Sequence, residues 1–134
     1  MAIVFVKRVL VERWRAFTLL LALGIVLGLF VGGAQPVAVG LFPAPWDKVA
    51  HASLFAVLAA SIGLASGLRG WRMLALAVAG ALVVATLDEW HQVYLPGRSA
   101  GLDDLAADAV GSLLGAVLLM VMAGKRRDAV CSPV

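Results

Sequence analysis

The chain has 134 residues and a formal net charge of +3, and 63% of its residues are hydrophobic. Its mean hydropathy is +1.00. Soluble domains contain about 45–50% apolar residues, so this composition leaves too little polar surface for a soluble globule. A chain of this length forms one domain, and we expect that domain to lie in a membrane.

Four apolar segments approach or reach the length that a helix needs to cross a bilayer. In chain order they extend from about Phe17 to Ala34, from about Val49 to Leu68, from about Met73 to Leu87 and from about Leu105 to Ala123. The apolar runs are continuous and lack the period-two alternation of barrel strands. The sequence therefore predicts an all-α, integral membrane four-helix bundle.

The segments that flank the bundle carry most of the basic residues. Residues 1–16 form an N-terminal interfacial segment that favours a short helix, residues 17–124 form the transmembrane domain, and residues 125–134 form a tail. The first apolar segment is longer than that of a cleaved signal peptide, so we expect it to be retained. Gly24, Gly28 and Gly32 form a small-residue ridge on this segment, which we expect to pack against another span; a second copy of the chain is the alternative.

Orientation follows from the distribution of Lys and Arg. Nine of them precede the first span, lie between the second and third, or follow the fourth, whereas Lys48 and Arg98 lie on the other side. Under the positive-inside rule both termini are cytoplasmic. The excess of positive charge is thus an orientation signal, and the sequence contains no nucleic-acid motif.

Ionisable residues gather at the outer end of the predicted bundle. The candidate ligand-binding residues there are Asp47, Lys48, His51, Glu89, Gln92, Arg98, Asp104 and Asp108. Spacings of three and four residues place His51 beneath Asp47 and Lys48. Asp104, Asp108, Gly111 and Gly115 form one stripe on the fourth span, polar at the top and small below, as expected of an inward face.

Structural roles compete with a binding role for several of these residues. Asp47 is placed to cap the second span, and Asp103 or Asp104 to cap the fourth. Asp88 and His91 are interpreted as solvated interface residues. His51 and Asp108 lie about one turn inside their helices, where an unpaired ionisable group is costly.

A carboxylate near a helix C-terminus is disfavoured and calls for a cation, and Glu89 occupies such a position. The turn at Pro96–Gly97 is able to reverse the chain. We therefore predict that Arg98 folds back over the bundle mouth and pairs with Glu89.

The spacing of these residues resembles the VanZ-like family. The resemblance covers about residues 40–120 and comprises Asp47–Lys48–x–x–His51, Glu89–x–x–Gln92–x–x–x–Pro96–Gly97–Arg98–Ser99 and Asp104–x–x–x–Asp108–x–x–Gly111–x–x–x–Gly115. Asp108 stands where many members are expected to have Asn. The family is named for a teicoplanin-resistance accessory protein, which implies a bacterial cytoplasmic membrane and the cell envelope but no defined reaction.

Three functions remain open from these residues. In the first, the outer site binds an anionic lipid or a peptidoglycan-related group, and Mg²⁺ or Ca²⁺ bridges the clustered carboxylates. In the second, an enzyme acts on a lipid phosphate with His51 as base or nucleophile. In the third, the polar cluster only ties helix ends together. The spacing of His51 and His91 does not favour a zinc site.

The orientation can be tested by cysteine labelling in intact cells. In a background without Cys131, an impermeant reagent should label Arg98→Cys strongly and Gly70→Cys weakly, because the charge distribution places position 98 outside. Strong labelling at 70 with none at 98 would reverse the topology and move the polar cluster to the cytoplasmic side.

Overall fold

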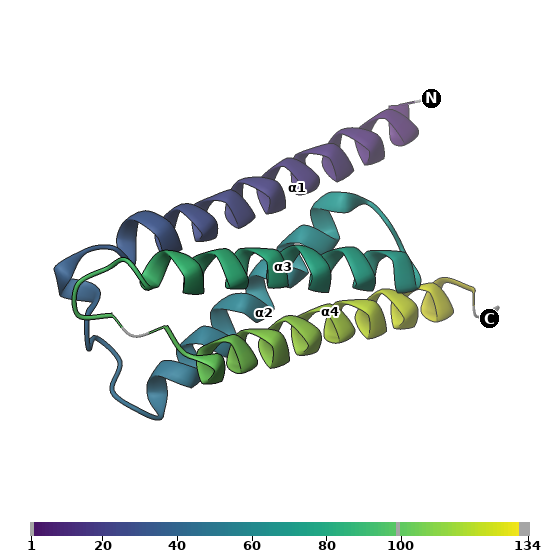
Figure 1. Ribbon diagram of the computed structural model, residues 1–134. Helices are drawn as coiled ribbons and strands as arrows, with labels where there is room; N and C mark the ends of the chain where they lie inside the picture. Colours follow the sequence, from purple (N-terminus) through teal and green to yellow (C-terminus); the bar gives the residue numbers. More distant parts are fainter. Residues whose placement is uncertain (1, 99, 132–134) are drawn as a thin grey trace.

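The computed structural model describes residues 2–98 and 100–131, and these residues form helices and connecting turns with no strand among them. Figure 1 shows the four long helices, which are α1 (Ala2–Leu27), α2 (Trp46–Ser66), α3 (Gly70–Gln92) and α4 (Leu102–Cys131). A π-helical turn, Gly28–Gly32, continues α1, and a short 3-10 turn, Pro36–Ala38, lies in the connection to α2. The all-α prediction is confirmed.

All four helices are long and apolar enough to cross a membrane. The candidate spans are Arg8–Gly32, Trp46–Ser66, Gly70–Gln92 and Leu102–Lys125. Large apolar side chains such as Leu20 and Leu114, which are 67% and 63% exposed, cover the outside of the bundle. Apolar surface of this extent suits a lipid environment.

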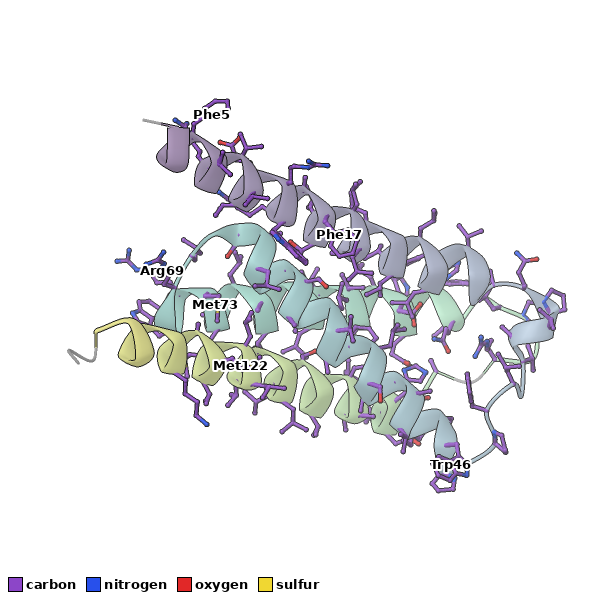
Figure 2. All side chains as sticks on the ribbon, turned by 180° about the vertical axis from the view of Figure 1, so that it is seen from behind. Phe5, Phe17, Trp46, Arg69, Met73 and Met122 are labelled. Carbon is purple, nitrogen blue, oxygen red and sulfur yellow. The ribbon has the colours of Figure 1, made fainter. Side chains whose placement is uncertain are left out.

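The two ends of the bundle differ in charge. The start of α1, the α2–α3 turn and the last turns of α4 lie at the same end of the bundle (Figure 1). This end contains residues 8–15 and 66–72 and is called the basic end below. The opposite end contains residues 46–51, 88–98 and 101–108 and is called the polar end. Arg69 and Trp46 mark these two ends in Figure 2. The side of the membrane that each end faces stays a prediction.

α1 is longer than the predicted first span. Residues 2–16 form no separate interfacial helix, because they continue without a break into the apolar segment. The reason is local, since α1 contains no proline and its first glycine is Gly24. At the other end of the chain α4 continues to Cys131, so the predicted tail begins as helix.

The expectation that the glycine ridge of α1 packs within the chain is wrong. An ideal Cβ built at Gly24, Gly28 or Gly32 meets no atom within 4 Å among the described residues. A neighbouring face of α1 packs against the other helices instead. Ala22 on this face belongs to the hydrophobic core, and Ile25 and Val26 pack against that core. The ridge stays open, and association of two copies through it stays a prediction.

The closest contact in the bundle is between α2 and α4. An ideal Cβ at Gly111 would lie 2.6 Å from the carbonyl carbon of Ala52, and one at Gly115 would lie 2.8 Å from that of Ala56. Real Cβ atoms do not approach other atoms so closely, so only glycine allows the two backbones to touch in this way. Small residues at a membrane helix interface have this role.

Gly111→Ala should therefore force α2 and α4 apart and destabilise the fold by about 1–3 kcal/mol, the usual cost of overpacking. Gly24→Ala is the matched control, because it adds the same methyl group to open space and should be neutral or slightly stabilising. The free energy of unfolding in detergent measures both. Equal effects of the two substitutions would contradict the close α2–α4 contact.

Candidate functional site

The glycine contact brings the polar stripe of α4 against the start of α2. His51 Nδ1 lies 3.0 Å from Asp108 Oδ1. The Asp108 side chain is completely buried, whereas that of His51 is 19% exposed. The prediction that His51 faces the fourth span is confirmed, and the carboxylate of Asp108 fixes the orientation of the imidazole ring.

One turn nearer the membrane surface, Lys48 is surrounded by carboxylates. Its Nζ lies 3.0 Å from Asp47 Oδ2 and 2.8 Å from Asp103 Oδ2, and it also donates a hydrogen bond to Asp104 Oδ1. Three carboxylates thus share one ammonium group. Lys48 ties the first turns of α2 and α4 together, and its charge is fully occupied within the chain.

The predicted capping roles are wrong. Pro45 occupies the N-cap position of α2 and makes no side-chain capping bond, so Asp47 lies inside the first turn. α4 begins at Leu102, so Asp103 and Asp104 also lie inside the first turn of their helix. There they still oppose the positive end of the helix dipole, but their oxygen atoms point to Lys48.

α3 contributes buried polar side chains to the same end. Gln92 Nε2 donates a 2.8 Å hydrogen bond to Asp88 Oδ2, and Asp88 is only 2% exposed. The interpretation of Asp88 as a solvated residue is therefore wrong, because the last turns of α3 turn this side chain into the bundle. The spacing of four between Asp88 and Gln92 was the signal that could have revealed the pair.

His91 is half-buried, not fully solvated as interpreted from the sequence. Its ring packs against Phe30 of the π-helical turn with 5.2 Å between ring centroids. This contact joins the end of α3 to the end of the first span.

The predicted ion pair between Glu89 and Arg98 is wrong. Glu89 Oε2 accepts a 2.7 Å hydrogen bond from the backbone N–H of Gly101, and Arg98 Nη2 donates a 3.0 Å bond to the carbonyl of Gly33. Gly97, with φ of +78°, turns the chain so that Arg98 reaches the end of the first span. Ser99, part of the same motif, lies outside the described residues.

Five buried side-chain atoms of the described residues have no hydrogen-bond partner, and all five belong to the polar end. They are Asp47 Oδ1, Glu89 Oε1, His91 Nδ1, Arg98 Nε and Asp108 Oδ2. Buried polar groups are nearly always paired, because an unpaired one loses its hydration without compensation. These atoms have hydrogen-bonding capacity left for water or for another molecule that enters the polar end.

Among the described residues, the carboxylates form no group that could hold a metal ion. Within the part of the chain that the structure describes, no group of three or more His, Cys, Asp or Glu side chains is arranged to hold a metal ion. The predicted bridge by Mg²⁺ or Ca²⁺ has no ligand set there. Lys48, Gln92, His51 and the Gly101 backbone each pair with at least one carboxylate oxygen instead.

The chain matches a family model described as VanZ/LLP1 over residues 2–123. No curated protein and no solved structure matches it. The family match extends from the start of α1 to the last turns of α4, so it includes the whole polar end.

The His51–Asp108 contact generates a prediction about stability. Asp108→Asn should fold nearly normally, because its amide still bonds to the imidazole. Asp108→Ala should cost about 1–3 kcal/mol, because the half-buried His51 Nδ1 loses its partner. His51→Gln should also fold, since Gln keeps a polar group facing Asp108. Thermal melts in detergent compare the three variants. A melt for Asp108→Ala that matches Asp108→Asn would show that the contact contributes nothing to stability.

Proposed function

The chain belongs to the VanZ/LLP1 family, and we propose that it is a cell-envelope membrane protein whose polar end binds the head group of an anionic lipid or a peptidoglycan-related molecule. The observation that supports this proposal most strongly is the set of buried polar atoms without partners. A structural cluster would satisfy its own hydrogen bonds, whereas a binding site keeps some for its ligand.

The chemistry of the unpaired atoms sets what the ligand presents. Asp108 Oδ2 and Glu89 Oε1 are acceptors, so the part of the ligand that reaches them donates hydrogen bonds, as hydroxyl, amide and ammonium groups do. Arg98 Nε is a donor, so the part near it carries an acceptor such as phosphate or carboxylate. Anionic lipid head groups with hydroxyl groups and peptidoglycan-related groups both combine these two features.

Electrostatics assigns the anionic part of the ligand to Arg98, not to Lys48. The polar end holds six carboxylates against two fixed cations, a formal charge of −4. Three of those carboxylates contact Lys48, whereas the hydrogen bond found for Arg98 goes to a backbone carbonyl. A further anion at Lys48 would be repelled by the three carboxylates already there, so Arg98 is the better anchor.

An enzymatic alternative rests on the His51–Asp108 contact. A carboxylate that holds Nδ1 of a histidine leaves Nε2 free for one of two roles. It can take a proton from a water molecule that attacks the phosphate, or attack phosphorus itself; in both cases the phosphorus–oxygen bond to the lipid breaks and the lipid alcohol leaves. In this alternative His51 acts on a lipid phosphate held by Arg98. A role in glycopeptide resistance rests on the family name and would follow if the bound group were a peptidoglycan precursor.

Binding can be measured by titration calorimetry with head groups that lack lipid tails, namely glycerol 3-phosphate and N-acetylmuramoyl pentapeptide. At least one should bind, and Arg98→Gln or Glu89→Gln should weaken its binding about tenfold or more, the cost of one hydrogen bond to a charged group. Arg8→Gln removes a charge at the basic end and is the matched control, which should bind as the wild type does.

Two other outcomes decide between the alternatives. Release of phosphate from a lipid phosphate by the wild type, lost in a folded His51→Gln variant, would select the enzyme. If neither head group binds the wild type, or if Arg98→Gln and Glu89→Gln bind as well as the wild type does, the binding proposal fails. A normal envelope phenotype for both variants would then reduce the polar end to a structural cluster.

A further inference from the structure

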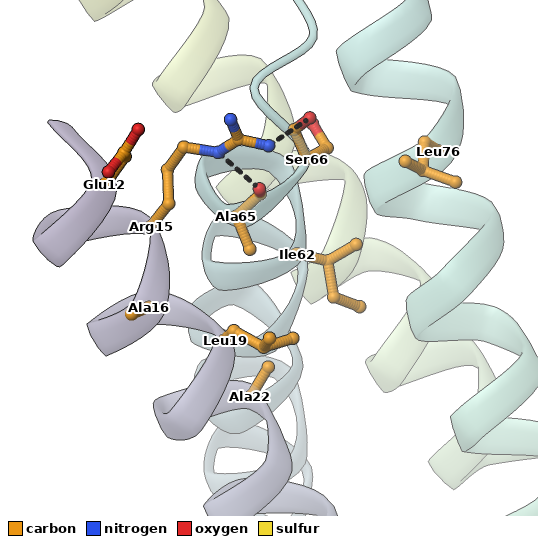
Figure 3. A pocket seen from close by; sticks show the side chains of 9 residues that line it. All are labelled: Glu12, Arg15, Ala16, Leu19, Ala22, Ile62, Ala65, Ser66 and Leu76. Carbon is orange, nitrogen blue, oxygen red and sulfur yellow. Dashed lines mark hydrogen bonds between the residues drawn. The ribbon is translucent and has the colours of Figure 1, made fainter. Parts of the chain in front are cut away.

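The basic end contains a groove that is separate from the polar end. In Figures 1 and 2, α1 packs along α2 but diverges from α3 toward its own N-terminus. The divergence leaves a groove of about 480 Å³ with α1 on one side, α3 on the other and α2 between them. Figure 3 shows it from close by.

The walls of this groove are apolar and its mouth is polar. Ile62 of α2 and Leu19 and Ala22 of α1 line the deeper part. Leu76 of α3 faces them from across the groove, and Arg15 lies at the mouth. The apolar part falls inside the candidate spans of all three helices. In a bilayer such a groove has no water to fill it, so the hydrocarbon chains of lipids are the available occupant.

The guanidinium of Arg15 is held in place by the end of α2. Its Nε donates a 3.0 Å bond to the carbonyl of Ala65, and its Nη2 donates a 3.2 Å bond to the carbonyl of Ser66. The guanidinium lies over Gly67, where φ is +67° and an ideal Cβ would be 2.9 Å from Arg15 Cζ. A guanidinium has five N–H donors, so donors remain beyond these two bonds.

The net charge of the basic end favours an anion. Arg8, Arg13, Arg69 and Arg72 belong to the same end as Arg15. Glu12 also lines the groove, but its carboxylate lies 3.2 Å from Arg8 Nε and is paired there. A phosphate group of a lipid would therefore find a fixed, partly unoccupied guanidinium at the depth where its acyl chain enters the apolar groove.

We infer that the groove between α1 and α3 binds one phospholipid with an anionic head group, whose phosphate contacts Arg15 and whose acyl chain lies against Leu19, Ala22, Ile62 and Leu76. This site is independent of the head-group site at the polar end. It would fix the position of the N-terminal half of α1, a helix that packs mainly against α2.

Native mass spectrometry of the full chain in detergent tests the inference, with phosphatidylglycerol and phosphatidylcholine as the added lipids. The wild type should retain phosphatidylglycerol about tenfold better than phosphatidylcholine. Both lipids carry a phosphate, but the choline of phosphatidylcholine neutralises its head group, so only phosphatidylglycerol keeps a net attraction to Arg15. Arg15→Gln should therefore remove the preference at this groove, an effect of about tenfold for one interaction between charged groups. Arg13→Gln removes an equal charge outside the groove lining and should retain the preference.

Arg15 also caps α2, so a second variant tests the groove without touching that contact. Ala16 lines the groove and is exposed, and Ala16→Phe should fill it and lower retention of both lipids severalfold. Ala106→Phe adds the same ring to an exposed position on α4 and should have no effect. Wild-type retention by Ala16→Phe would overturn the groove, and equal retention of the two lipids by the wild type would overturn the anionic head group. Bound lipids are counted one by one: Glu89→Gln should leave the Arg15-dependent lipid in place even where it weakens a lipid at the polar end, which separates this site from the proposed function.

Discussion

The close contact of α2 with α4 determines most of what the polar end can do. Because Gly111 and Gly115 have no side chain, the backbone of α4 reaches Ala52 and Ala56 directly. That approach places Asp108 at 3.0 Å from His51 and the first turn of α4 around Lys48. A wider separation of the helices would leave these charges facing apolar surroundings unpaired, at a cost of several kcal/mol. The small residues and the charged residues are thus parts of one interface.

The buried polar atoms that lack a hydrogen-bond partner all lie at one end of the described bundle. Most polar atoms of the buried cluster have partners within the chain, and the five exceptions belong to the polar end. At the basic end the guanidinium of Arg15 donates two hydrogen bonds to the end of α2. Arg15 thus has a defined structural role at the end of α2, whereas the polar end retains buried polar atoms without partners.

The sequence was sufficient for the class of fold and for half of the site. The length of the apolar segments identified four spans. Helical spacing identified the inward stripe of α4 and predicted that His51 of α2 faces it. It failed where a partner comes from a loop. The predicted pair of Arg98 and Glu89 rests on their nearness in sequence and their opposite charges. In the structure Arg98 bonds to the carbonyl of Gly33, and Glu89 bonds to the backbone N–H of Gly101. The burial of Asp88 depends on which side of α3 faces the bundle. Most of α3 is apolar on all sides, so its sequence does not indicate that side.

The central claim is that the unpaired atoms at the polar end hold a head group. The most direct measurement is an electron cryomicroscopy structure of the protein in nanodiscs of native envelope lipid, at a resolution that separates side chains. The account predicts non-protein density within hydrogen-bond distance of Arg98 Nε and of the free carboxylate oxygen of Glu89 or Asp108. A polar end in which Arg98 and Glu89 pair with each other, with only protein density around them, would contradict it.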